Sequence, residues 1–188
     1  MAKQIYQIQI ALTDIKPKIW RRLLVNSDIL LVDFHRIIQT AMGWSNSHLH
    51  QFNDGVMDYS PKEFELEDSI DSRKVKLKTI LKMEKSKILY EYDFGDGWNH
   101  DIILEKIIKE EDKGQIPRCL KGKGNCPPED CGGPWGYMEL LKTISNPKHL
   151  DYESMMEWLG GEFDPNFFDL DEINEQLNQK DYGCLWIE

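Results

Sequence analysis

Three cysteines and two acidic residues lie within one short segment of the chain, residues 117–137 (PRCLKGKGNCPPEDCGGPWGY). They are Cys119, Cys126, Cys131, Glu129 and Asp130. Thiolates are strong zinc ligands, but the C-x6-C-x4-C spacing is wider than the paired C-x2-C of structural zinc sites, and it supplies three ligands where a closed site needs four. His100 is the best candidate for the fourth. The alternative is that the cysteines pack as small buried hydrophobic residues.

Proline and glycine are concentrated in the same segment, which holds four of the eight prolines in the chain. Proline fixes φ, and glycine opens backbone conformations that are closed to other residues. The composition therefore predicts a fixed loop over residues 117–135, of the kind that holds a ligand or joins two layers of a fold. If it binds a ligand or partner, we expect Glu129, Asp130 and Trp135 to make the contacts.

A second group of titratable residues lies in YDFGDGWNH, residues 92–100. It contains Asp93, Asp96 and His100, and a histidine with several carboxylates could bind a divalent cation or act as an acid–base pair. Hairpin-turn chemistry alone also explains Asp96. His100 shares a predicted strand face with Trp98, and it needs a partner for each ring nitrogen.

The sequence His48-x-His50 offers a third set of ligands. On a strand these two side chains share a face, so both imidazoles could reach one metal ion. Alternatively, they cap the backbone of a turn formed by residues 45–47. His35, beside Phe34 on a predicted helix, is expected at the surface or at the boundary of the core.

The elements that must position these residues follow from hydrophobic periodicity. Strands are predicted at 5–12, 18–25, 48–53, 87–94 and 98–108, and helices at 34–42, 136–145, 152–159 and 169–179. Residues 75–83 fit either a short helix or a strand, 106–114 are predicted to be an exposed loop, and 184–187 a last strand or a docked end. Strands early and helices late indicate an α+β fold. We expect a mainly antiparallel sheet from the N-terminal two-thirds, packed by one early helix and a C-terminal helical segment.

Length and composition favour one domain over residues 1–188, with a strand-rich part at 1–108, the loop at 117–135 and a helical part at 136–180. A net charge of −10 disfavours a nucleic-acid partner, because gripping phosphates needs a basic surface. The lysines of 73–87 largely alternate with apolar residues, which is typical of a solvated face. The sequence shows neither a signal peptide nor a membrane span, so we expect a soluble cytoplasmic protein with reduced cysteines.

Five segments together resemble a known family. They are PKIWRRLLV (17–25), HRIIQTAMGWSNSHLHQF (35–52), YEYDFGDGWNHDIILE (90–105), CLKGKGNCPPEDCGGPWGY (119–137) and EWLGGEFDPNFFDLDEIN (157–174). In this order they resemble the pRi-plasmid ORF-3-like family, whose members are also found as passenger products of insertion sequences. The charged insert 105–116 departs from the pattern. The resemblance supports the fold and implies no particular catalytic activity.

Two hypotheses for function follow. In the first, the protein is a binding or interaction module that recognises a protein or a small ligand through a face formed by 92–100 and 119–137. In the second, it is a metal-dependent hydrolase, or a nucleic-acid-processing accessory protein of mobile elements. Zinc is the cofactor that the second hypothesis suggests, with His48 and His50 as further ligand candidates.

Overall fold

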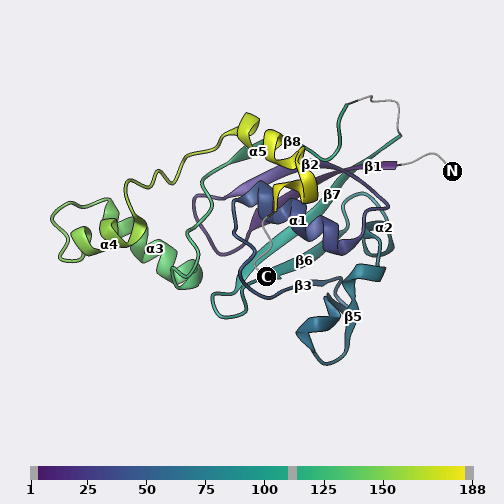
Figure 1. The fold of residues 1–188 in the computed structure, drawn as a ribbon, viewed down its shortest axis with the longest axis horizontal. Coiled ribbons are helices and arrows are strands. Elements are labelled where there is room, and N and C mark those ends of the chain that lie inside the picture. The colour runs from purple at the N-terminus through teal and green to yellow at the C-terminus, as the bar shows by residue number, and fades with distance from the viewer. Residues whose placement is uncertain (1–3, 110–113, 185–188) are drawn as a thin grey trace.

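A computed structural model describes residues 4–109 and 114–184 (Figure 1). Its strands are β1 (Gln4–Leu12), β2 (Trp20–Asn26), β3 (His50–Asn53), β4 (Asp58–Ser60), β5 (Ser69–Asp71), β6 (Lys87–Tyr92), β7 (Trp98–Lys109) and β8 (Arg118–Lys123). Its helices are α1 (Leu31–Met42), α2 (Leu77–Ile80), α3 (Gly133–Ile144), α4 (Tyr152–Leu159) and α5 (Leu170–Leu177), with 3-10 turns η1 (Lys62–Phe64), η2 (Ser72–Lys74) and η3 (Lys180–Gly183). The fold is α+β, as the sequence predicts.

The eight strands form one sheet in the order β5-β4-β3-β6-β7-β1-β2-β8. All neighbouring strands are antiparallel except β4 and β5. Strands β1 and β2 pair as one antiparallel hairpin and β6 and β7 as another, and alternation with a period of two gives each strand one apolar face.

One face of the sheet is covered by helix α1, which crosses the central strands, and α5 lies beside α1 near β8 (Figure 1). The side chains of Ile8 and Ile10 on β1 and of Phe34 and Ile37 on α1 have no exposed surface. The opposite face is polar: Arg22 of β2 and Glu105 of β7 form a two-pronged ion pair with distances of 2.6 and 2.7 Å. The core therefore lies between the sheet and α1.

Helix α1 ends at Gly43, which has a φ of 108°, and the Gly43 N–H donates to the carbonyl of Gln39 at 2.8 Å. The left-handed conformation at this position is the reason for a glycine there. The chain then turns back through residues 44–49 toward β3. This turn brings Ser45 and His48 to the end of the β6–β7 hairpin, where the candidate site lies.

Two predicted loops contain strand residues. The charged segment 106–114 was expected to be a loop, but β7 continues to Lys109 and pairs with Gln4 of β1; residues 110–113 lie outside the described ranges. The predicted loop 117–135 contains strand β8, which pairs with β2, and the first turn of α3. Both errors have the same cause: β1 and β2 need hydrogen-bonding partners along their whole length, and local composition does not reveal that need.

The ambiguous segment 75–83 contains the short helix α2, and of the predicted tail element 184–187 only Cys184 lies in the described residues. Helices α3 and α4 pack on each other at one end of the molecule, away from α1 (Figure 1). In the ranges 4–109 and 114–184, no helix has the length and apolar character needed to cross a membrane.

Candidate functional site

The tip of the β6–β7 hairpin packs against the segment that precedes α3. The Gly132 N–H donates to Oδ2 of Asp96 at 3.1 Å. At Gly133, whose φ is 67°, an added Cβ would lie 2.2 Å from the Asp96 carbonyl oxygen, so only glycine allows this approach. The two segments that the sequence singled out, 92–100 and 119–137, therefore meet in space.

Asp93 stabilises the hairpin tip with one carboxylate oxygen and presents the other oxygen to His48. It has a φ of 56° and is 7% exposed, and its Oδ1 accepts hydrogen bonds from the N–H groups of Gly95 at 3.0 Å and Asp96 at 3.3 Å. The second oxygen, Oδ2, lies 3.6 Å from Nδ1 of His48. One carboxylate thus both closes the turn and begins a charged cluster.

His48 lies among three carboxylates that come from two different segments. Besides Asp93 at Nδ1, its Nε2 lies 3.4 Å from Oδ1 of Asp130 and 3.7 Å from Oε2 of Glu129. Nε2 is buried and has no hydrogen-bond partner among the described residues, so these contacts are electrostatic. We call His48, Asp93, Glu129 and Asp130 the His48 cluster.

Glu129 is held in place by three donors on one of its oxygens. Its Oε1 accepts from the Ser45 N–H at 2.7 Å, from the Ser45 hydroxyl at 2.9 Å and from the Tyr92 hydroxyl at 3.1 Å. Burial, together with the Glu129 charge, raises the pKa of Tyr92, so this hydroxyl stays protonated and can donate. The other oxygen, Oε2, is buried without a hydrogen-bond partner in the part of the chain that the structure describes.

The distances in the cluster suit a metal ion. One ligand atom from each of His48, Asp93 and Asp130 lies within 4.8 Å of the others, and no other group of three or more His, Cys, Asp or Glu does so within residues 4–109 and 114–184. Atoms bound about 2.1 Å from a tetrahedral zinc ion lie about 3.4 Å apart. Asp93 faces Nδ1 of His48 and Asp130 faces Nε2, so a metal ion bound to one ring nitrogen requires the carboxylate beside the other nitrogen to turn toward it.

The three cysteines of the segment 117–137 are not members of this ligand group. Cys119 and Cys126 belong to the hydrophobic core, and Cys131 packs against it. Burial raises the pKa of Cys131 to about 12 and raises the pKa values of the other two, so all three are neutral thiols at pH 7. Among the described side chains they form no ligand group with His100. Their geometry favours packing, the alternative to the zinc-site prediction.

His100 and His50 are buried without a carboxylate nearby. His100 has no exposed surface, and its Nδ1 lies 3.0 Å from the Trp98 carbonyl oxygen. Burial lowers its pKa to about 4, so the ring is neutral. His50 is 4% exposed and stacks on His35, with ring centroids 3.4 Å apart. The expectation that His35 lies at the surface or at the boundary of the core is wrong: the residue is 1% exposed, because its ring stacks on His50 of β3 and its Nδ1 lies 2.8 Å from the Tyr90 hydroxyl of β6.

Trp135, unlike the buried histidines, is exposed to solvent. It lies in the first turn of α3 and is 85% exposed, although an aromatic in an apolar pattern is usually packed. It follows Gly132 and Gly133, which contact the hairpin tip at Asp96.

Sequence reasoning missed two functional groups of this region, Ser45 and Tyr92. Ser45 was assigned only to a turn, and Tyr92 only to the apolar face of a strand. The signal that could have found them is their position next to candidate residues: Tyr92 precedes Asp93, and Ser45 lies three residues before His48.

A cavity of about 790 Å³ lies next to the cluster. His35, His48 and His50 line one part of it, and Leu30, Val32 and Phe64 give it apolar walls. A volume of this size is in the range of small-molecule sites. The cluster therefore borders a space that could accept a ligand.

Comparisons with known proteins agree with this fold. The family model described as plasmid pRiA4b ORF-3-like protein matches residues 4–172. The uncharacterized protein y4hQ of Sinorhizobium fredii (strain NBRC 101917 / NGR234) is 33% identical over 189 residues, which cover 99% of this chain and 96% of that protein. The crystal structure of the protein of unknown function MM3350 from Methanosarcina mazei Go1 has a TM-score of 0.81 and 33% identity, covering 92% of this chain and 98% of that one. The chain belongs to the plasmid pRiA4b ORF-3-like family, as its resemblance to that family indicates.

Proposed function

We propose that this protein is a binding module that holds a divalent metal ion on the face formed by 92–100 and 119–137. The ligands are His48, Asp93 and Asp130, with Glu129 beside them. The observation that carries the proposal is that one ligand atom from each of His48, Asp93 and Asp130 lies within 4.8 Å of the others.

The charge of the cluster supports a cation. Asp93, Glu129 and Asp130 have no ion-pair partner other than His48 among the described residues. Three carboxylates close to one imidazole repel one another, and a bound divalent ion relieves that repulsion. Imidazole and carboxylate together suit zinc or manganese better than the harder calcium ion.

A metal-dependent hydrolase is the second candidate, and the exposure of the site favours it. Asp93 is buried, while the Asp130 side chain is 72% exposed, so a metal ion held there keeps open positions toward solvent. A catalytic metal needs such a position for water or substrate. The neighbouring cavity of about 790 Å³ would hold the substrate.

The test is elemental analysis of protein purified without a polyhistidine tag, followed by titration with zinc and manganese. We expect close to one equivalent of metal, lost in His48→Ala and retained in His149→Ala. His149 is a matched control because it also lies beside a carboxylate, Asp151, at 3.8 Å, but outside any ligand group of the described residues.

Two further variants separate the possible ligand sets. Retention of metal in Cys119→Ser and His100→Ala supports the His48 cluster, whereas loss of metal in both supports the cysteine set predicted from sequence. Absence of metal, with no binding in the titration, would overturn the proposal. Metal binding without turnover of p-nitrophenyl acetate or bis-p-nitrophenyl phosphate would leave the binding module and remove support for the hydrolase.

The proposed partner is a protein or small ligand, and the proposed location is the cytoplasm. Cys119, Cys126 and Cys131 are free thiols, which agrees with a reducing compartment. The exposed Trp135 supplies an apolar contact point on the same face, as binding surfaces commonly do.

A further inference from the structure

A buried arginine lies on the far side of α1 from the 790 Å³ cavity. Arg21 of β2 is 2% exposed, and its Nε donates to the carbonyl of Ala41 at 2.7 Å. Its Nη1 donates to the carbonyls of Trp20 at 2.9 Å and Lys123 at 3.1 Å. These bonds join β2, β8 and the end of α1 through one guanidinium group.

The positive charge of Arg21 lacks an acidic partner. Within the described ranges no carboxylate forms an ion pair or hydrogen bond with it, and Nη2 has no hydrogen-bond partner; its guanidinium lies 4.9 Å from the centre of the Phe168 ring. The C-terminus of α1 compensates only part of a unit charge. Burial accordingly lowers the pKa of Arg21. A buried charge of this kind is costly unless an anion accompanies it.

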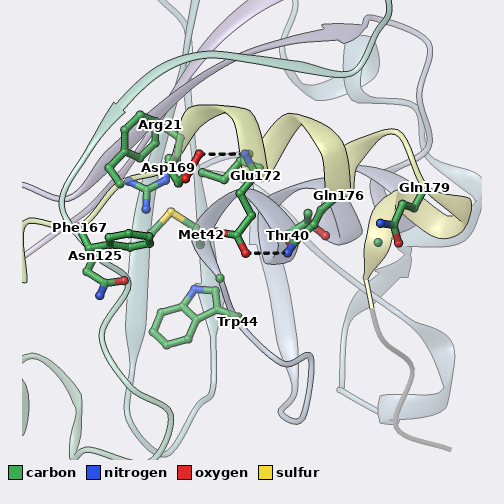
Figure 2. A pocket seen from close by; sticks show the side chains of 14 residues that line it. Arg21, Thr40, Met42, Trp44, Asn125, Phe167, Asp169, Glu172, Gln176 and Gln179 are labelled. Carbon is green, nitrogen blue, oxygen red and sulfur yellow. Dashed lines mark hydrogen bonds between the residues drawn. The ribbon is translucent and has the colours of Figure 1, made fainter. Parts of the chain in front are cut away.

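Arg21 lines a cavity of about 530 Å³ between the end of α1, the Asn125 region and α5 (Figure 2). Trp44 lines it too, is 7% exposed, and its indole N–H has no hydrogen-bond partner in the described part of the chain. Figure 2 shows Arg21, Met42 and Trp44 near one end of the cavity, with Gln176 and Gln179 toward the other. Two nine-tenths-buried side chains with unused N–H donors thus border the same space.

We propose that this cavity binds the carboxylate group of a small organic acid, with Arg21 Nη2 and Trp44 Nε1 as donors and with Met42 and Phe167 against its apolar body. Arginine and indole N–H groups are suited to a planar anion. A single charge matches the single guanidinium, whereas a phosphate dianion would be repelled more strongly than a monoanion by Asp169 and Glu172, which line the same cavity. The site shares no residue with the His48 cluster, so it does not depend on the proposed metal.

The test is a titration followed by NMR, with the Trp44 indole N–H as reporter, assigned by comparison with Trp44→Phe. Benzoate is the probe, benzamide is its uncharged counterpart, and phenyl phosphate is the dianionic counterpart. We expect a saturable shift of the Trp44 signal with benzoate, at least tenfold weaker binding of benzamide, and weaker binding of phenyl phosphate. Arg21→Gln should weaken benzoate binding by about tenfold or more.

Since Arg21 also joins three elements, Arg21→Gln may be replaced by variants that leave the core intact if it fails to fold. Glu172→Gln removes an opposing charge from the wall and should tighten benzoate binding severalfold. Phe167→Ala, at a side chain that is 51% exposed, should weaken benzoate and benzamide equally. No saturable shift at Trp44 with benzoate, equal binding of benzoate and benzamide, tighter binding of phenyl phosphate, or no effect of Glu172→Gln would each overturn the proposal.

Discussion

His48 and His50 are two residues apart and have opposite chemical environments. The His48 side chain is 25% exposed and lies 3.4 to 3.7 Å from three carboxylates. His50 is 4% exposed, stacks on His35 and contacts the edge of Phe64, and neither of its ring nitrogens has a hydrogen-bond partner among the described residues. Both residues border the same cavity.

The environments of His48 and His50 differ because different groups of the protein face each imidazole ring. His48 precedes the strand and faces the hairpin tip and the Glu129 segment, which are rich in acidic groups. His50 is the first residue of β3, opposite Tyr92 of β6, and lies under α1. Burial without a counter-charge lowers the pKa of His50 well below its ordinary value, so it is neutral. Residue type and spacing alone do not distinguish a metal ligand from a core histidine.

The largest expected effect is a loss of stability in mild acid. Burial lowers the pKa of His35 and of His100 to about 4, and it lowers the pKa of His50 well below its ordinary value. The unfolded chain therefore binds more protons than the folded chain between about pH 6.5 and pH 4, and stability falls as pH falls through that window. His35 and His100 each contribute a loss of about 3 kcal/mol by pH 4, and the lowered pKa of His50 acts in the same direction. Urea unfolding at pH 7, 5.5 and 4.5 measures this fall in the free energy of unfolding.

His100→Phe should reduce the pH slope, because it removes one of the buried neutral rings. An unfolding free energy that does not change between pH 7 and 4.5 would contradict the assignment of neutral buried histidines.

The next effect is on metal affinity. Asp93→Asn removes a charged ligand but keeps an oxygen that can accept from the N–H groups of Gly95 and Asp96. We expect zinc affinity to fall by about 100-fold with little change in melting temperature. Competition with a fluorescent zinc chelator measures the affinity. Asp101→Asn, on the same hairpin but paired with Lys87, should leave affinity unchanged, and an equal loss in both variants would argue against a local site.

A smaller effect is expected from replacing the buried imidazole. His50→Phe removes two buried nitrogens that have no hydrogen-bond partner among the described residues, and it keeps a ring against His35 and Phe64. The free energy of unfolding at pH 7 should rise by about 1 kcal/mol. His48→Phe should give no such gain. A clear loss of stability in His50→Phe would indicate that its nitrogens are hydrogen-bonded in solution, for example to water.

The smallest effect is expected at Trp135. Because its side chain is 85% exposed, Trp135→Ala should change the free energy of unfolding by less than about 0.5 kcal/mol. Trp98→Ala is the contrast: Trp98 has no exposed surface, and its loss should cost about 3 to 5 kcal/mol. Thermal unfolding of the Trp135→Ala and Trp98→Ala variants measures the two losses of stability. A large loss of stability in Trp135→Ala would show that this tryptophan packs in solution.

Most elements of the fold are predictable from local patterns. Strand β1 alternates, with Ile8 and Ile10 buried and Gln7 and Gln9 less so, because successive side chains point to opposite faces. Helix α1 follows from its apolar spacing and from Gly43. The missed strand residues are Lys109 and 118–123, and only pairing with β1 and β2 makes them part of strands.

Sequence alone determined which segments concentrate titratable and thiol side chains: 92–100, 117–137 and the His48–His50 pair all stand out by residue type. Only the tertiary structure decided which members act together. It brought His48 to Asp93, Glu129 and Asp130, and placed the cysteines, His100 and His50 in apolar surroundings. The physical reason is that the charge state and ligand capacity of a side chain depend on its burial and on neighbours that are distant in the chain.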